Sequence, residues 1–149
     1  MQFTYTNKST PEDIRLKFNG SVDSFSDLNA GQKTAIDSTL IAELIAETAS
    51  TFNPDATAVL DIGCGAGNYS LRIASFLPKA NFTLVDLSEN MLARAEQRLL
   101  SATTGKITCI HSDIRKAKIP ENNYDIVVAA TSLHHLREDA EWIKVFTSI

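Results

Sequence analysis

The stretch AVLDIGCGAGNYS, residues 58–70, joins a run of apolar residues to three glycines within five positions. The apolar run is typical of a buried β-strand, and the glycines predict a tight turn at its end. A turn without side chains lets a ligand approach the backbone closely. The stretch therefore predicts a strand, a turn at a ligand site and a following helix.

Three further apolar runs repeat the strand pattern: NFTLVDL at 81–87, KITCIHSD at 106–113 and YDIVVAAT at 124–131. Helical stretches separate the first three of the four runs. Strands that alternate with helices are typical of a parallel sheet. We therefore predict an α/β fold, with a doubly wound, mainly parallel sheet and helices on both faces.

The helix after the second strand has clear boundaries in the sequence. Ser88 is a candidate N-cap, and Gly105 lies beyond the predicted C-terminal end. The residues predicted to face the core lie at helical spacing: Met91, Leu92, Ala95 and Leu99. These features predict a helix that packs on the sheet through one apolar face.

The first 56 residues are predicted to be helical. Thr10 is a candidate N-cap and Pro11 takes the first helical position of a short helix. A longer helix is expected over about residues 30–52, and its predicted apolar stripe consists of Ile36, Leu40, Leu44 and Ile45. We expect residues 1–56 to form a helical segment that caps the ligand cleft, and residues 57–149 to form the N-terminal part of the ligand-binding domain.

Composition limits the classes of function. A chain of 149 residues, 44% of them hydrophobic, is long enough for one domain with a core. The net charge of −4 argues against a broad nucleic-acid surface, and the basic cluster RKAK at 115–118 is interpreted as a solvated loop. Cys64 and Cys109 lack metal-ligand spacing and are interpreted as small, buried, reduced residues, so no metal site is expected. No signal core or membrane span is apparent, which makes a cytoplasmic location the expectation.

The spacing of the glycines restricts the ligand. Such a turn suits a dinucleotide pyrophosphate, a nucleotide triphosphate or an adenosyl ligand without phosphate. The dinucleotide fingerprint requires a glycine where this chain has Asn68, and no Gly-Lys-Ser/Thr follows for a triphosphate. Asp61, at the end of the strand, would repel a pyrophosphate but suits a ligand with a positive charge.

The motif VLDIGCGAG resembles the first motif of the class I methyltransferases that use S-adenosylmethionine, which have a Rossmann-like fold. TLVDLSENML, HSDIRKAKIP and YDIVVAATSLHHL resemble their second, third and fourth motifs, in the same order. The resemblance runs from about Val59 to Leu136. Within the class, the chain looks most like the small-molecule and the ubiquinone or tRNA-modifying types.

The predicted second strand supplies the residue with the clearest role. Asp86 ends this strand roughly 20 residues beyond the turn, where its two oxygens can accept both hydroxyls of a ribose. Leu87 and Met91 are candidates for an apolar wall against the purine, although the helical spacing of Met91 equally fits ordinary core.

The resemblance implies roles for further residues. The carboxylate of Asp113 would accept from the adenine amino group, and the Ile114 amide would face a ring nitrogen. Asp61, Gly63 and Gly65 would hold the methionine end of S-adenosylmethionine, with Asp61 near its ammonium group directly or through water. The remaining residue of the turn, Cys64, would face either the ligand or the core.

The segment TSLHHL is expected at the methyl-transfer end of the cleft. His134 or His135 is the candidate to take a proton from the acceptor, because imidazole titrates near neutral pH. A capping or surface role is the competing interpretation for each histidine. The N-terminal aromatic candidates near the sulfonium are Tyr5, Phe18 and Phe25, and Arg15 is a conjectural contact for the ligand carboxylate.

Two functions from different classes stay open. The first is an S-adenosylmethionine-dependent methyltransferase that acts on a small molecule or a modified nucleoside. The second is a module that binds S-adenosylmethionine without catalysis, or a truncated fragment that needs a partner, because the sequence is expected to cover this class of domain only as far as the helix after the fourth core strand. A nicotinamide dehydrogenase is a distant third. A tRNA acceptor is not indicated by the net charge, a homodimer stays open, and no membrane contact is expected.

Overall fold

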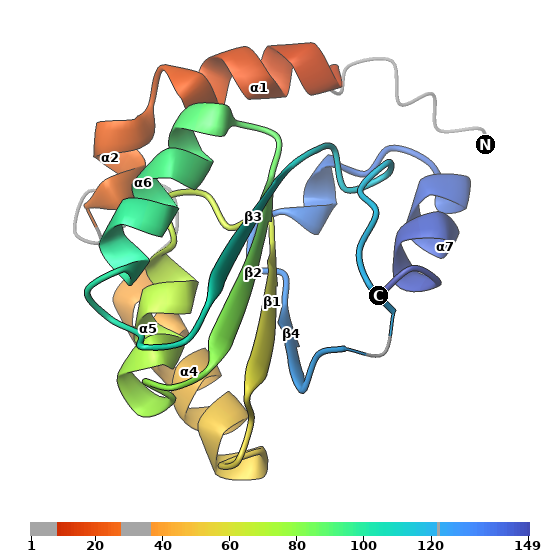
Figure 1. The fold of residues 1–149 in the computed structure, drawn as a ribbon. Helices are drawn as coiled ribbons and strands as arrows, with labels where there is room; N and C mark the ends of the chain where they lie inside the picture. The colour runs from red at the N-terminus through yellow and green to blue at the C-terminus, as the bar shows by residue number, and fades with distance from the viewer. Residues whose placement is uncertain (1–8, 28–36, 122) are drawn as a thin grey trace.

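Four strands form one parallel sheet in the computed structural model, which describes residues 9–27, 37–121 and 123–149 (Figure 1). The strands are β1 (Ala58–Ile62), β2 (Asn81–Asp86), β3 (Ile107–His111) and β4 (Ile126–Val128), in the order β3-β2-β1-β4. The chain moves outward from β1 to β3 and then returns to the other side of β1. This reversal creates a switch point between β1 and β4, where α/β sheets bind their ligands.

Three helices cover one face of the sheet (Figure 1). They are α4 (Ser38–Phe52), α5 (Asn68–Phe76) and α6 (Glu89–Leu99). Val59, Phe82 and Leu84 of the strands pack against buried residues of these helices. Alternation along β1 and β2 sends every second side chain into this layer, which forms the larger core.

The start and the buried face of α6 are as the sequence predicts. The Ser88 side chain caps the helix by accepting a hydrogen bond from the Met91 N–H at 3.2 Å. The four residues predicted to face the core are all buried: Met91, Leu92, Ala95 and Leu99. The predicted parallel α/β architecture is confirmed.

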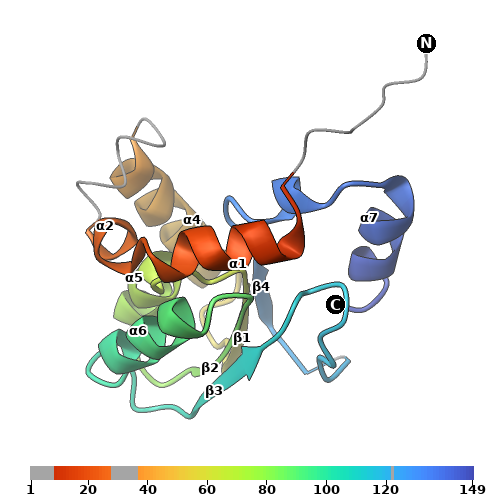
Figure 2. The same cartoon turned by 90° about the horizontal axis from the view of Figure 1, so that it is seen from above.

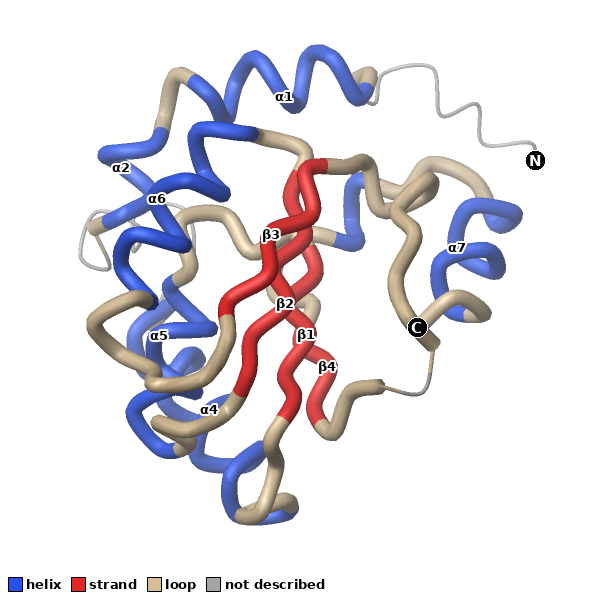
Figure 3. Tube along the Cα trace, viewed as in Figure 1, coloured by secondary structure: helices blue, strands red, loops and turns tan. Residues whose placement is uncertain are grey.

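The opposite face is covered mainly by irregular chain. Leu60, Ile62 and Val85 pack against side chains of the segment 112–125 and against Leu133 of the short 3-10 helix η1 (Leu133–His135). Helix α7 (Asp139–Phe146) lies on this side, beyond that segment (Figure 3). Helices therefore lie on both sides of the sheet, but α7 is farther from the strands than α4, α5 and α6.

The N-terminal helices α1 (Pro11–Asn19) and α2 (Val22–Ser26) lie over the carboxyl ends of the strands (Figure 2). Thr10 caps α1 as predicted, in a reciprocal arrangement with Asp13. This capping box satisfies amides that the first turn of a helix leaves unpaired.

The predicted apolar stripe of the longer helix is wrong in part. Ile36 and the expected helical residues before position 37 lie outside the described residues, but Leu40 is 55% exposed and Leu44 51% exposed. The buried residues are Ala42 and Ala46. Small side chains take the inner face because α4 packs closely on α5, which leaves the leucines outside.

Cys64 is buried as predicted, whereas Cys109 is exposed. Cys109 lies on β3, which forms one edge of the sheet and is incompletely covered. The prediction of a buried Cys109 is therefore wrong, because the position of β3 in the sheet, rather than its composition, decides this exposure.

Candidate functional site

A cavity of about 460 Å³ opens at the carboxyl ends of the strands. Its walls come from α1, α2, the start of α4, the glycine turn and the ends of β2, β3 and β4. Among the residues lining it are Phe18, Phe25, Gly63, Cys64, Gly65, Asp86, Leu87, Met91, Asp113, Ile114, Arg115, Ser132, His134 and His135. The residues assigned from the sequence to the glycine turn, to the ribose, to the nucleobase and to proton transfer lie on this wall, whereas Asp61 and Arg15 do not.

The glycine turn brings the backbone to the edge of the cavity. Gly63 and Gly65 have φ angles of 67° and 52°, a conformation that favours glycine. A Cβ on Gly63 would lie 2.3 Å from the Cβ of Ser132, whereas a Cβ on Gly65 would meet nothing within 4 Å. The open space beside Gly65 belongs to the cavity, so a ligand can reach this part of the backbone.

Asp86 joins the turn to the end of β2. Its Oδ2 accepts the Gly65 N–H at 2.8 Å and its Oδ1 accepts the Ser88 N–H at 2.8 Å. Burial raises the pKa of the carboxyl, against the opposing effect of these backbone hydrogen bonds. A carboxylate has about four acceptor sites, so each oxygen can still accept one ligand hydroxyl.

Apolar side chains continue the wall from Asp86. Leu87 lines the cavity, as does Met91, which is also fully buried in the core. Met91 therefore belongs to the core, and its contact with a purine stays a prediction. Cys64 likewise belongs to the core and to the wall, and burial raises the pKa of its thiol well above the usual value.

Asp61 lies below the turn, under α5, and is not among the residues that line the cavity. It is 2% exposed, and its Oδ2 accepts a hydrogen bond from Ser70 Oγ at 2.5 Å. Burial raises the pKa of Asp61 to about 7, and the nearby Asp86 charge acts in the same direction. Contact between Asp61 and a ligand ammonium stays a prediction. Because Asp61 does not line the cavity, such a contact would have to run through a bridging water.

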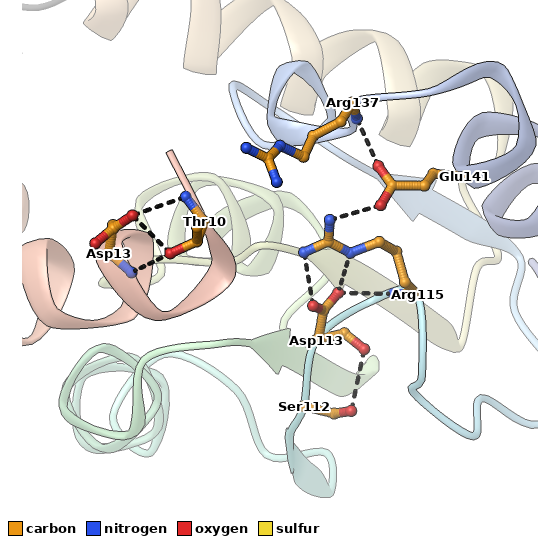
Figure 4. Close-up of polar contacts among 7 residues, drawn as sticks. All are labelled: Thr10, Asp13, Ser112, Asp113, Arg115, Arg137 and Glu141. Carbon is orange, nitrogen blue, oxygen red and sulfur yellow. Dashed lines mark hydrogen bonds and ion pairs between the residues drawn. The ribbon is translucent and has the colours of Figure 1, made fainter. Parts of the chain in front are cut away.

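Asp113 and Ile114 follow β3 and line the cavity on the side away from the glycine turn. Arg115 binds the Asp113 carboxylate through both oxygens (Figure 4). Burial acts to raise the pKa of Asp113, but the hydrogen bonds and charge of Arg115 outweigh it, so the pKa lies below the usual value.

Aromatic rings line the cavity between α1 and η1. Phe18 packs edge-to-face on Phe25 and on His135, with centroid distances of 5.2 and 6.0 Å. His134 and His135 lie 4.0 Å apart, measured between ring centroids. Thus Phe18, one of the rings predicted to lie near the sulfonium, contacts His135, one of the candidate proton acceptors, while Tyr5 lies outside the described residues.

Arg15 is bound elsewhere. Its guanidinium donates to both oxygens of Glu12, at 2.8 and 2.6 Å, on the outer surface of α1. Arg15 does not line the cavity, so its proposed contact with a ligand carboxylate has no support in this geometry.

The sequence reasoning missed several residues of the site. Ser132 closes on Gly63 and donates to the Ile62 carbonyl at 2.7 Å, and Thr131 beside it has a φ of 55°. Asn68 donates to the Phe25 carbonyl at 2.9 Å and accepts from Arg98 at 2.8 Å. The position of Thr131 and Ser132 after a predicted strand was a usable signal, because ligands bind at strand ends.

The interpretation of RKAK as a solvated loop is wrong for Arg115, whose side chain is only 14% exposed. Lys116 and Lys118 are exposed as expected. Arg115 is mostly covered because carboxylates from two segments surround it, and a local charge count does not contain that information.

Comparison with known proteins gives the family. A family model described as a methyltransferase domain matches residues 59–149, and the chain belongs to this family. The class I fold and the S-adenosylmethionine-dependent class inferred from the motifs are confirmed.

Curated relatives match parts of the chain. An uncharacterized methyltransferase of Mycobacterium tuberculosis is 38% identical over 80 residues, which cover 54% of this chain and 38% of the relative. Trans-aconitate 2-methyltransferase of Mycobacterium ulcerans is 36% identical over 86 residues, covering 58% and 30%. Malonyl-[acyl-carrier protein] O-methyltransferase of a Paenibacillus species is 28% identical over 141 residues, covering 89% and 50%. The chain thus spans half or less of the length of these relatives.

Solved structures share the fold. A SAM-dependent methyltransferase from Leishmania major has a TM-score of 0.68 at 20% identity, with 93% of this chain and 56% of that chain covered. The amino pentose methyltransferase CalS10 from Micromonospora echinaspora, solved with bound SAM, has a TM-score of 0.57 at 26% identity, covering 72% and 42%. The plantazolicin methyltransferase BpumL in complex with SAH has a TM-score of 0.60 at 21% identity, covering 93% and 54%. S-adenosylmethionine and its product are therefore the ligands of neighbours of this fold.

The described residues lack two features, a metal site and a membrane span. Within them, no group of three or more histidine, cysteine, aspartate or glutamate side chains could hold a metal ion. In the same residues, no helix has the length and apolar character needed to cross a membrane.

Proposed function

We propose that this chain binds S-adenosylmethionine in the cavity at the strand ends and transfers its methyl group to a small-molecule acceptor. The observation that carries the proposal is Asp86, a half-buried carboxylate fixed by the Gly65 and Ser88 amides beside open space. A ribose offers two neighbouring hydroxyls, and a carboxylate held in this way can accept both.

The order of the strands in the sheet suggests how the ligand is oriented in the cavity. The glycine turn, Asp86 and Asp113 follow β1, β2 and β3, which are neighbours in the sheet. A ribose at Asp86 therefore places the nucleobase toward Asp113 and Ile114. The methionine end then lies toward Gly63 and Gly65.

The bound cofactor supplies an activated methyl group on a sulfonium. The protein has to orient the acceptor and exclude water, because positioning alone lowers the barrier of such a displacement. Phe18 and Phe25 form an apolar wall over the cavity. His135, in contact with Phe18, is the proposed proton acceptor when the attacking atom carries a proton, and His134 is its neighbour in this role.

The names of the curated relatives support the proposal that the acceptor is a small molecule. Two of the three curated relatives are named after their acceptors, trans-aconitate and malonyl-[acyl-carrier protein]. The net charge of −4 does not favour a tRNA acceptor. A modified nucleoside is the alternative acceptor to include in a screen.

Ligand-dependent thermal unfolding tests the cofactor site first. A ligand at about 100 times its dissociation constant adds roughly 2.7 kcal/mol of stability, which raises the melting temperature by several degrees. We expect this shift with S-adenosylmethionine and S-adenosylhomocysteine, and none with NADH. Absence of a shift with both adenosyl ligands would contradict the proposed site.

A matched pair of variants identifies the residue. Asp86→Asn keeps one acceptor oxygen but loses the charge, so we expect affinity for S-adenosylhomocysteine to fall about tenfold or more. Asp55→Asn, an exposed acid after α4, is the control and should bind like the wild type. Transfer of labelled methyl to carboxylic acids or nucleosides then separates a methyltransferase from a module that only binds.

A further inference from the structure

Arg115 lies at the cavity wall and is hydrogen-bonded to two carboxylates, a role that the sequence motifs did not indicate. Its Nε donates to Oδ1 of Asp113 at 2.8 Å, and its Nη2 donates to Oδ2 at 2.6 Å (Figure 4). The side chains are only 14% and 12% exposed. A two-point guanidinium contact of this kind fixes the orientation of the carboxylate as well as its place.

A second carboxylate fixes Arg115 from the other side. Its Nη1 donates to Oε1 of Glu141 at 2.9 Å, and the Arg137 backbone N–H donates to the other oxygen, Oε2, at 2.5 Å (Figure 4). Glu141 belongs to α7 and lies 26 residues after Arg115. The orientation of Asp113 therefore depends on where α7 packs.

The hydrogen bonds leave a defined acceptor on Asp113. Oδ1 accepts two donors, the Nε and the backbone N–H of Arg115, while Oδ2 accepts only Nη2. Each carboxylate oxygen has about two acceptor sites, so Oδ2 keeps one. Among the described residues, the neighbouring Ile114 N–H has no backbone hydrogen-bond partner.

An acceptor beside a donor matches one edge of adenine. The exocyclic amino group donates and the adjacent ring nitrogen accepts, which complements Asp113 Oδ2 and the Ile114 N–H. Hypoxanthine has a carbonyl and a protonated nitrogen at these positions, so both contacts would be mismatched. Unpaired groups in a buried site cost more affinity than paired groups gain.

We propose that Arg115 and Glu141 are positioning residues for the nucleobase, such that Arg115 presents Oδ2 of Asp113 to the adenine amino group and Glu141 holds Arg115 from α7. This inference rests on the proposed function, because it requires an adenosyl ligand in the cavity. It assigns to α7 a part in base selection although, among the described residues, none of α7 lines the cavity.

The test compares two ligands on each variant. Affinities for S-adenosylhomocysteine and for S-inosylhomocysteine, its hypoxanthine analogue, are measured by calorimetry. We expect Arg115→Gln to weaken S-adenosylhomocysteine binding about tenfold and to reduce the preference for adenine by a similar factor. Glu141→Gln should act in the same direction with a smaller factor. The ratio of the two affinities on one variant is insensitive to a general loss of stability.

Arg72→Gln is the matched control. Arg72 pairs with Glu43 on the α4–α5 surface and does not line the cavity. We expect its adenine preference to equal that of the wild type. In the double variant Arg115→Gln/Glu141→Gln, the change at Glu141 should add little to the loss of adenine preference caused by the change at Arg115, because Glu141 acts through Arg115.

The outcomes separate the two proposals. If the wild type binds neither ligand, the proposed function fails. If the wild type prefers adenine and Arg115→Gln keeps that preference unchanged, the positioning role is overturned while the function stands. Should Arg115→Gln fail to fold, Arg115→Lys decides, since it keeps the charge without the two-point contact and should still lose adenine preference.

Discussion

Gly63 and Gly65 share a left-handed backbone but differ in what surrounds them. Gly63 lies against Ser132, which comes from the segment after β4, so its missing side chain permits contact within the protein. Gly65 faces the open cavity, and its N–H is held by Asp86. One glycine therefore serves folding and the other serves the ligand.

Alanine substitutions at Gly63 and Gly65 should separate the effect on protein stability from the effect on ligand binding. Gly65→Ala should cost about 1 kcal/mol of stability through its positive φ, and should weaken S-adenosylhomocysteine binding at least about tenfold by filling ligand space. Gly63→Ala should cost about 2 to 4 kcal/mol because strain and the contact with Ser132 add. Urea unfolding and calorimetry measure both effects. Gly20→Ala, with ordinary backbone and room for a Cβ, is the control.

Asp61 is a buried carboxyl whose pKa of about 7 results first from burial. An aspartate in the unfolded chain has a pKa of roughly 3.9, so between about pH 4 and 7 the folded protein holds the extra proton. Stability from this group is therefore present below pH 4 and is lost as pH rises toward 7.

Asp61→Asn should flatten this pH dependence. The amide oxygen can still accept from Ser70, but the residue no longer titrates. We expect the fall in unfolding free energy between pH 5 and pH 8 to shrink by on the order of 2 kcal/mol, measured by urea unfolding at each pH. The exposed Asp55→Asn should leave the slope as it is. Equal slopes for the wild type and Asp61→Asn would show that Asp61 is ionised in the fold.

At the scale of elements, polar contacts attach the N-terminal helices to the domain. Ser88 Oγ donates to Asn19 at 2.5 Å, and Asn68 donates to the Phe25 carbonyl at the end of α2 at 2.9 Å. The Arg94–Asp23 pair at 2.9 Å is exposed and contributes little. The two asparagine contacts thus hold Phe18 and Phe25 over the cavity.

Removal of the Asn68 side chain should loosen this cover. Asn68→Ala loses the bonds to Phe25 and Arg98, so we expect faster hydrogen exchange in α2 and an affinity for S-adenosylhomocysteine lower by about threefold to tenfold. The exposed Asn123→Ala is the control and should change neither. If exchange in α2 stays at the wild-type rate, Asn68 does not fasten this helix.

At the scale of the whole molecule, the cavity is assembled from segments far apart in the sequence. Phe18 of α1 and His135 of η1 meet above it, and the turn after β1 closes against Ser132 after β4. A ligand that fills the cavity contacts all of these segments together. Its binding energy should therefore stabilise the N-terminal helices and the β4–α7 connection at the same time.

Hydrogen exchange with and without S-adenosylhomocysteine measures this coupling. We expect slower exchange in four separate segments, 14–18, 63–65, 112–115 and 132–136. The segments 54–57 and 76–80, at the opposite end of the sheet, should exchange at unchanged rates. Protection confined to 63–65 would indicate a shallow site limited to the turn.

The sequence alone is enough to predict the strands, the parallel sheet, the caps at Thr10 and Ser88 and the position of Asp86 at the end of the second strand. These features follow from the periodicity of apolar residues and from local turn and cap chemistry, which a short window of sequence contains. The rule that ligands bind at the carboxyl ends of the strands then predicts where the cavity lies.

The tertiary structure alone decided which side chains are covered and where the charges point. Leu40, Leu44 and Cys109 are exposed, Asp61 lies below the turn, and Arg115 lies between two carboxylates. Each of these outcomes depends on a neighbour distant in the chain, such as α5 against α4 or Glu141 against Arg115. Local sequence patterns do not specify such neighbours, because packing brings them together only in the complete fold.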